Sequence, residues 1–314
     1  MLTDKVATGN TVNSVRVLVN KAVSITLAVA ALCALFGVLS AGLLHYFNSG
    51  PGFYLGTVDN SSTVDSADIL GTPDNFVDPE THILAQFVVT CSLVRALPVD
   101  PIVMSGHEHA FFGNKEVGVG SASAVKNALT SCAVPTDTAS YWVPTLVNGN
   151  KSLLPDRAVA YYRKGIGVTT AEISPYPPDF FMLAGPSADN KVAFWNCAPS
   201  GQNSLTVPVC ATGENLVMVV TFPDCWDGRN NDSAGHRAHV RYSTKGICPE
   251  NHPKHIPQLI LKVVYNTRNH NTADYRLSSG GVLPHADFLN TWNQAELEKL
   301  VLTCLVRNQV CPRH

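Results

Sequence analysis

Short apolar runs separated by turn-forming residues recur along the chain between about residues 86 and 265. Runs such as QFVVTCSLV, AVAYYRK, NLVMVVTF and QLILKVVYN are rich in β-branched and aromatic residues. Proline, glycine and asparagine lie between them, as is typical of strands joined by short turns. The pattern predicts an all-β domain of the sandwich or jelly-roll type, with minor helices.

Two segments carry a helical pattern instead. The first is SASAVKNALTSC at 121–132, and the second is NQAELEKLVLTCLVRNQV at 293–310. In the second, Asn293 is a suitable N-cap and Glu296 is placed to complete a capping box. We therefore expect the better-defined helix near the end of the chain.

The N-terminal region differs from the rest. Residues 22–44 contain no charged side chain, and as a helix they would cross a hydrocarbon core of about 30 Å. Lys5, Arg16 and Lys21 precede this span, so the positive-inside rule places the N-terminus in the cytoplasm. We expect an uncleaved signal anchor, with a cleaved signal peptide as the alternative.

This interpretation divides the chain into a cytoplasmic segment (1–21), a membrane span (22–44), a linker rich in Gly, Ser, Asn and Pro (45–80) and an extracytoplasmic β domain (81–314). The protein is then a single-pass cell-membrane protein, or is secreted if the span is removed. The formal net charge is −2 and no Lys/Arg-rich run occurs, which argues against a nucleic-acid partner.

Eight of the nine cysteines lie beyond the apolar span, an even number that suits disulfides in an oxidising compartment. Pairing of cysteines close in sequence favours Cys197–Cys210 and Cys225–Cys248. A zinc–thiolate site is less favoured, because the chain has no C-x-x-C pair.

Histidine is the residue that most suggests chemistry. The chain has 11, several of them in short groups such as His107-Glu108-His109 and His236-Arg237-Ala238-His239. Two histidines at i and i+2 on a strand share one face, roughly 6.5–7 Å apart. Such rings can bind a divalent metal, act as general acid or base, or contact a substrate.

A third group pairs His285 with Asp287, and the turn PDCWDG would present Asp227 beside His236 and His239. The alternative for Asp227 is that it only caps its own turn.

The order of GHEHAFFG, SYWVPTL, PDCWDGRNNDSAGHRAHVRY and LPHADFLNTW resembles a domain-of-unknown-function family of secreted proteins from fungi and actinobacteria. Such domains often occur beside WSC carbohydrate-binding modules. The resemblance covers about residues 87–304 and implies an exported protein with polysaccharide or cell-wall glycan as partner. Ala286 and Thr291 stand where the family usually has glycine.

Three functions remain open. In the first, the protein is a polysaccharide lyase or hydrolase; its catalytic candidates are His107, His109, His236, His239, His285, Asp227 and Asp287, and its substrate-binding candidates are Arg237, Tyr141, Trp142 and Trp226. The second is a non-catalytic glycan-binding module that uses exposed tryptophans. The third is a structural envelope protein whose histidines, with His107, His109, His236 and His239 as the first candidates, hold a divalent metal.

Overall fold

The computed structural model describes residues 86–102, 106–117, 128–169, 172–186, 192–199, 201, 203–267, 271–309, 311 and 314. The cytoplasmic segment, the membrane span at 22–44 and the linker at 45–80 lie outside these residues, so those three predictions remain predictions. Within the described ranges, every helix is too short or too polar to cross a membrane.

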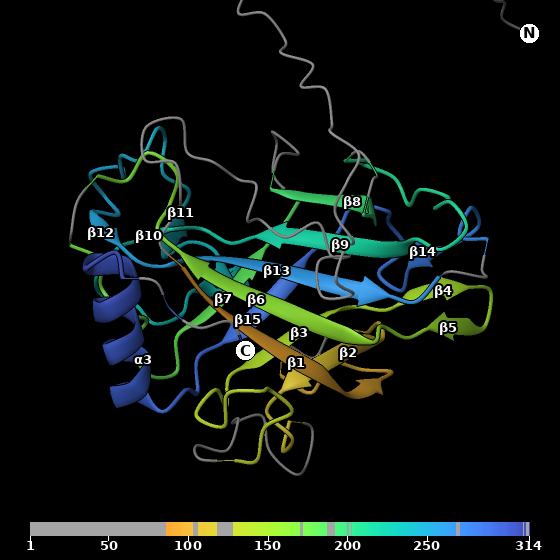
Figure 1. Ribbon diagram of the computed structural model, residues 1–314, viewed down its shortest axis with the longest axis horizontal. Coiled ribbons are helices and arrows are strands. Elements are labelled where there is room, and N and C mark those ends of the chain that lie inside the picture. The colour runs from red at the N-terminus through yellow and green to blue at the C-terminus, as the bar shows by residue number, and fades with distance from the viewer. Residues whose placement is uncertain are drawn as a thin grey trace, which may run out of the picture. The chain divides into compact units, whose positions relative to one another are not determined.

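Antiparallel strands dominate the described part of the chain and form one nine-stranded sheet in the order β7-β15-β3-β2-β1-β6-β13-β9-β8 (Figure 1). Its strands are β1 (Gln86–Leu97), β2 (His109–Gly113), β3 (Ser140–Pro144), β6 (Arg157–Arg163), β7 (Phe181–Ala184), β8 (Ala193–Ala198), β9 (Asn215–Thr221), β13 (Gln258–Tyr265) and β15 (Ala286–Leu289). The mostly β fold expected from the sequence is confirmed. A sandwich would consist of two separate sheets. Here the nine strands form one continuous sheet instead.

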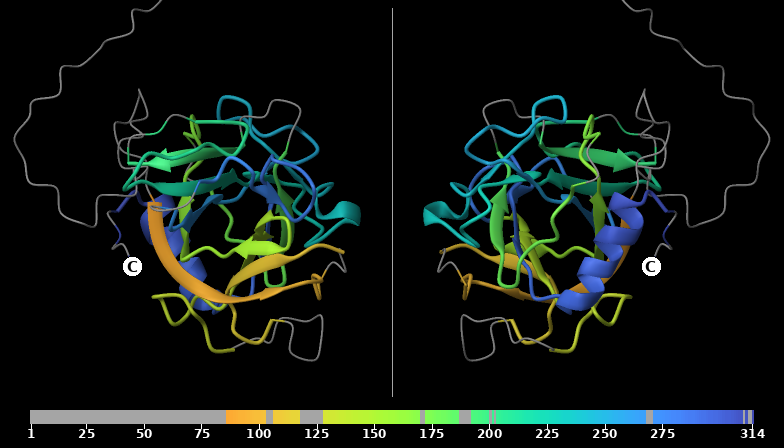
Figure 2. Two further views of the ribbon diagram at one scale, coloured as in Figure 1. Left: turned by 90° about the vertical axis from the view of Figure 1, so that its right-hand side faces the viewer. Right: turned by 90° about the vertical axis from the view of Figure 1, so that its left-hand side faces the viewer.

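Strand β1 joins the two halves of this sheet. Its first part, Gln86–Ser92, pairs with β6, whereas the part from Leu93 to Leu97 pairs with β2. The register shifts between Leu93 and Arg95, and such a bulge bends a strand and increases its twist. Figure 2 shows β1, in orange, curving from one half of the sheet to the other.

The main core lies between the inner faces of the two halves. Along β1, Phe87 and Val89 belong to this core, while Val88 belongs to a separate cluster on the outer face. The alternation follows from the two-residue repeat of a strand. A third cluster, which includes Phe111, Trp142, Phe181 and Leu289, lies on the outer face of the β7-β15-β3-β2 half.

Two three-stranded sheets flank the large one. The first has the order β11-β10-β12 and the second β14-β4-β5. Their strands are β10 (Cys225–Trp226), β11 (Val240–Arg241), β12 (Lys254–His255), β4 (Leu146–Asn148), β5 (Lys151–Leu153) and β14 (Arg276–Leu277).

The predicted C-terminal helix is present as α3 (Gln294–Leu300), which continues as the π-helical segment η4 (Val301–Val306). The Asn293 side chain caps it by accepting from the backbone N–H of Glu296. The backbone N–H of Asn293 donates to the carbonyl of Thr136, so Glu296 does not complete a capping box. The helix predicted at 121–132 is wrong for its described part, 128–132, which forms isolated bridges.

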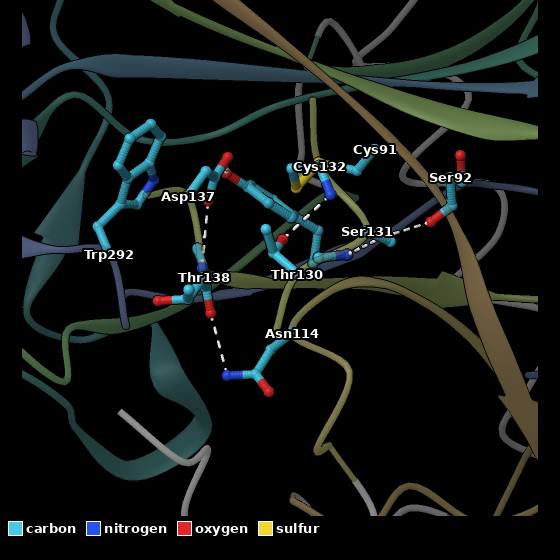
Figure 3. Close-up of a disulfide and its surroundings, with 12 residues drawn as sticks. Cys91, Ser92, Asn114, Thr130, Ser131, Cys132, Asp137, Thr138 and Trp292 are labelled. Carbon is cyan, nitrogen blue, oxygen red and sulfur yellow. Dashed lines mark hydrogen bonds between the residues drawn. A yellow bond between two sulfur atoms is a disulfide. The ribbon is translucent and has the colours of Figure 1, made fainter. Parts of the chain in front are cut away.

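All eight cysteines beyond the apolar span form disulfides. The two predicted pairs, Cys197–Cys210 and Cys225–Cys248, are confirmed, and the others are Cys91–Cys132 and Cys304–Cys311. Figure 3 shows Cys91–Cys132 beside hydrogen bonds that tie Ser131 to Ser92 and Asn114 to Thr138.

Candidate functional site

The outer face of the β7-β15-β3-β2 half carries the polar residues of interest. Strand pairing sets His109 opposite Pro144, and Asp287 opposite Trp142. Cross-strand partners point to the same side of an antiparallel sheet. His285 precedes Asp287 by two residues and therefore points to this side as well.

His107, His109 and His285 converge on this face. The ring centroids of His107 and His109 are 4.3 Å apart, and the ring of His285 lies 5.6 Å from His107 and 5.8 Å from His109. One nitrogen from each ring lies within 4.8 Å of the other two. We call these three residues the histidine cluster.

The two rings of the H-x-H sequence are closer than a strand spacing predicts, because His107 precedes β2. The intervening Glu108 holds this turn in place. Its carbonyl accepts from the backbone N–H of Thr145 at 3.1 Å and from the Ser278 hydroxyl at 2.5 Å. Its carboxylate accepts from the Thr145 hydroxyl at 2.6 Å. The Glu108 side chain is therefore held away from the cluster, whereas His107 and His109, on either side of Glu108, belong to it.

A buried carboxylate lies behind His109. Asp100 Oδ2 is 3.8 Å from His109 Nδ1 and accepts a 2.7 Å hydrogen bond from Trp142 Nε1. Asp100 Oδ1 accepts from the backbone N–H of Ile102. The contact with His109 is longer than a hydrogen bond. A carboxylate that closes to hydrogen-bond distance of one ring nitrogen orients the other nitrogen toward a metal.

Several polar atoms at this site are buried without a hydrogen-bond partner among the described residues. They are Nε2 of His107, both ring nitrogens of His109 and both carboxyl oxygens of Asp287. Buried polar groups are nearly always satisfied, and each exception asks for a missing ligand, water or ion. Several unpartnered polar atoms on one face of the sheet indicate a binding site for a ligand, water or ion.

The environment favours neutral imidazoles. Burial, followed by the neighbouring His107, lowers the pKa of His109 to about 3. Burial also lowers the pKa of His285 to about 3, with further contributions from His109, His107 and Arg237. Burial lowers the pKa of His107, although Asp100 opposes this shift. The neutral ring is the form that binds a metal ion.

Asp287 differs from a surface carboxylate. Burial and the nearby Asp100 raise the pKa of Asp287 well above its usual range, while Arg237 opposes the shift. Its side chain is buried, whereas His107 and His285 are partly exposed.

Gly185, directly after β7, permits the close approach to His285. Its φ is +80°, and an added Cβ would lie 2.3 Å from the carbonyl oxygen of Pro284 and 3.0 Å from Cα of His285. Only glycine fits this position without moving the backbone.

His236 and His239 form a second group, apart from the histidine cluster. His236 stacks on Phe181 with ring centroids 3.9 Å apart and pairs with Asp232 at 2.7 Å. His239 Nδ1 is 2.8 Å from the Ser233 hydroxyl. Gly235, with a φ of +72°, and the Ser233 bonds to the backbone N–H groups of residues 238 and 239 shape this loop. The structure therefore groups His285, rather than His236 or His239, with the H-x-H pair.

The remaining predicted residues have varied surroundings. Asp227 accepts from the backbone N–H groups of Arg229 and Asn230 and thus caps its own turn, the alternative stated from the sequence. Tyr141 and Trp142 are completely buried and present no surface to a substrate. Trp226 is half-buried, and its Nε1 donates to the carbonyl of Asn230.

Two other groups of potential ligands contain disulfides. Cys225 and Cys248 lie near His255, and Cys91 and Cys132 lie near Asp137. Oxidised sulfurs are not thiolate ligands. A cavity of about 510 Å³, lined partly by Lys254, His255 and Leu302, contains none of the predicted site residues.

Sequence reasoning missed Asp100 and the supporting Thr145. Neither belongs to a histidine group or to a recognisable motif. Asp100 becomes relevant only because the loop after β1 returns it to Trp142 and His109. A pattern search along the chain offers no signal for either residue.

The fold and site define a disulfide-bonded, mostly β domain with a partly buried cluster of three histidines that could hold a metal ion. The chain matches the family described as Domain of unknown function (DUF1996) over residues 98–292 and belongs to that family. No curated protein and no solved structure matches it.

Proposed function

We propose that His107, His109 and His285 bind one divalent transition-metal ion, and that the ion serves a reaction on an extracellular polysaccharide. The observation that carries the proposal is the convergence of three imidazole nitrogens within 4.8 Å, two rings of which have buried nitrogens lacking partners among the described residues. Four-coordinate zinc with nitrogen ligands at 2.0–2.1 Å needs ligand separations of about 3.3 Å. The nitrogens lie within 4.8 Å of one another, so metal binding requires the rings to move closer by at most about 1.5 Å.

A ligand set of three neutral imidazoles is typical of catalytic zinc sites. Structural zinc sites use four protein ligands instead. The fourth position then belongs to water or substrate. His107 and His285 are partly exposed, whereas His109 is buried, so the cluster is open toward solvent on one side. This access supports a reactive centre over a closed structural one.

Polysaccharide as substrate rests on other support. The motifs of this chain resemble secreted proteins found beside carbohydrate-binding modules, and four disulfides suit an oxidising compartment. A non-catalytic aromatic glycan platform has less support, because Trp142, Trp195 and Trp292 are buried.

The first test is metal analysis of the purified protein after dialysis against zinc. We expect one zinc per chain, at least a hundredfold weaker binding for His109→Ala and His285→Ala, and unchanged binding for His236→Ala. Equal losses in His236→Ala and His285→Ala, or no bound zinc in the parent protein, would overturn the metal site.

The second test concerns the reaction. Zinc-loaded protein is incubated with uronate-containing and neutral polysaccharides, and unsaturated products are followed by absorbance and reducing ends by colorimetry. We expect products that disappear in His285→Ala. Retained zinc and glycan binding without any product would instead assign a binding module.

A further inference from the structure

Arg237 begins the loop that follows η3 (Ala234–His236). The loop is held down at its start, where His236 stacks on Phe181 of β7. The carbonyl of Arg237 accepts from Arg241 Nη1 at 2.9 Å and from the backbone N–H of Val240 at 3.3 Å. Because β7 pairs with β15, this anchoring brings Arg237 over the strand that carries Asp287.

The loop lies on the face of the sheet that carries the cluster. Leu183 of β7 pairs with Asp287 of β15, so Phe181, two residues before Leu183, points to the same side as Asp287. The ring of His236, the residue directly before Arg237, stacks on Phe181. The side chain of Arg237 is half-buried, and its charge lowers the pKa of His285 and opposes the raised pKa of Asp287.

The guanidinium nevertheless makes no hydrogen bond or ion pair with any side chain in the described ranges. Asp287, the nearest carboxyl group, has no hydrogen-bond partner there either, so the two residues do not form a salt bridge. None of its nitrogens is among the buried atoms that lack a partner, so the unpaired donors of Arg237 reach solvent. They are therefore available to a ligand.

The rim of the site therefore combines two kinds of group. His107, His285 and Arg237 are partly exposed, whereas His109, Asp100 and Asp287 are buried. A ligand from solvent can therefore reach His107, His285 and Arg237.

We propose that Arg237 binds the carboxylate of an acidic sugar unit, which makes uronate-containing glycans the ligand class of this site. The inference rests on the proposed function for the role of the cluster, but the contact with Arg237 itself needs no metal. A planar carboxylate matches one guanidinium with two parallel hydrogen bonds. One guanidinium carries a single positive charge, which balances a carboxylate but not a phosphate dianion.

Ligand-observed NMR on the full chain tests this contact, with sodium glucuronate, glucose and inorganic phosphate as probes on metal-free and zinc-loaded protein. We expect glucuronate to bind and glucose and phosphate to bind more weakly. Arg237→Gln should weaken glucuronate binding about 10- to 100-fold, the value of a charged hydrogen-bonded pair. Arg237→Lys should retain part of the affinity.

Arg241→Gln is the matched control, since Arg241 lies on the same segment, is exposed and bonds only backbone carbonyls. Zinc content and thermal midpoint report whether each variant is folded. Equal glucuronate binding by the parent protein and Arg237→Gln, or preference for glucose or phosphate, overturns the inference. If the protein binds no zinc but binds glucuronate through Arg237, only the metal site is overturned. If it binds zinc but no glucuronate, only the role of Arg237 is overturned.

Discussion

Asp100 and His109 form a buried pair in which Oδ2 of the carboxylate lies 3.8 Å from Nδ1 of the imidazole. The same oxygen accepts from Trp142 Nε1, so the indole fixes the carboxylate against the ring. The pair comes from two segments, the loop after β1 and the start of β2. The separation is longer than a hydrogen bond, so the carboxylate acts on the imidazole through its charge.

Asp100→Asn should weaken zinc binding about 10- to 100-fold, the usual effect of losing a carboxylate that orients a ligating histidine. The amide keeps the shape of the side chain, so the fold should persist. Competition with a chromophoric chelator measures the zinc affinity. Asp232→Asn, beside His236, provides the matched control and should leave it unchanged. An unaltered affinity in Asp100→Asn would show that Asp100 does not orient His109.

Gly185→Ala should destabilise the domain and also weaken zinc binding, since its Cβ would collide with Pro284 and His285. Gly280→Ala is the control, because Gly280 has a similar φ of +88° but open space around it. The control should lose only about 1–2 kcal/mol, the cost of a side chain in the left-handed region. Urea unfolding and zinc titration of both variants compare the effects. Equal losses in the two variants would mean that the contact with His285 is unimportant.

Asp137 should make stability depend on pH. Burial raises the pKa of Asp137 to about 8, although hydrogen bonds from Tyr141 and Ala139 oppose the shift. The folded state therefore binds this proton more tightly than the unfolded chain. The contribution of protonated Asp137 to the free energy of unfolding is fully present below about pH 4. It is lost as the pH rises toward 8, by up to about 1.4 kcal/mol per pH unit.

Asp137→Asn removes this proton. The difference in unfolding free energy between the parent protein and the variant should therefore change across pH 4–8, with the parent losing stability relative to the variant. Urea unfolding at several pH values measures it. A difference that stays constant over this window would contradict the raised pKa.

Removal of the Cys91–Cys132 disulfide should cost more than removal of Cys304–Cys311. Their cysteines are separated by 41 and 7 positions. Loop-closure entropy then predicts losses of about 4 and about 2 kcal/mol for the paired Cys→Ala variants. Chemical unfolding under oxidising conditions compares the two double variants. The reverse order would show that local packing outweighs chain entropy.

Much of the local structure follows from neighbouring residues alone. Asn293 caps α3 as its sequence predicts, and the Cys197–Cys210 and Cys225–Cys248 pairs close short loops. The apolar runs became strands because β-branched and aromatic residues suit a half-buried pleated surface. The H-x-H sequence likewise identified two members of the site.

The third member depended on the tertiary structure. His285 reaches His109 only because β15 pairs with β3, and β3 with β2, in the register that sets Asp287 opposite Trp142. Register between strands distant in sequence depends on the whole core and is not determined by any local pattern. His236 and His239 were equally attractive in the sequence, yet Gly235 and Ser233 bend their loop into a separate group. The sequence by itself determined the residue types, the caps and the nearby disulfides, whereas long-range pairing decided which histidines meet.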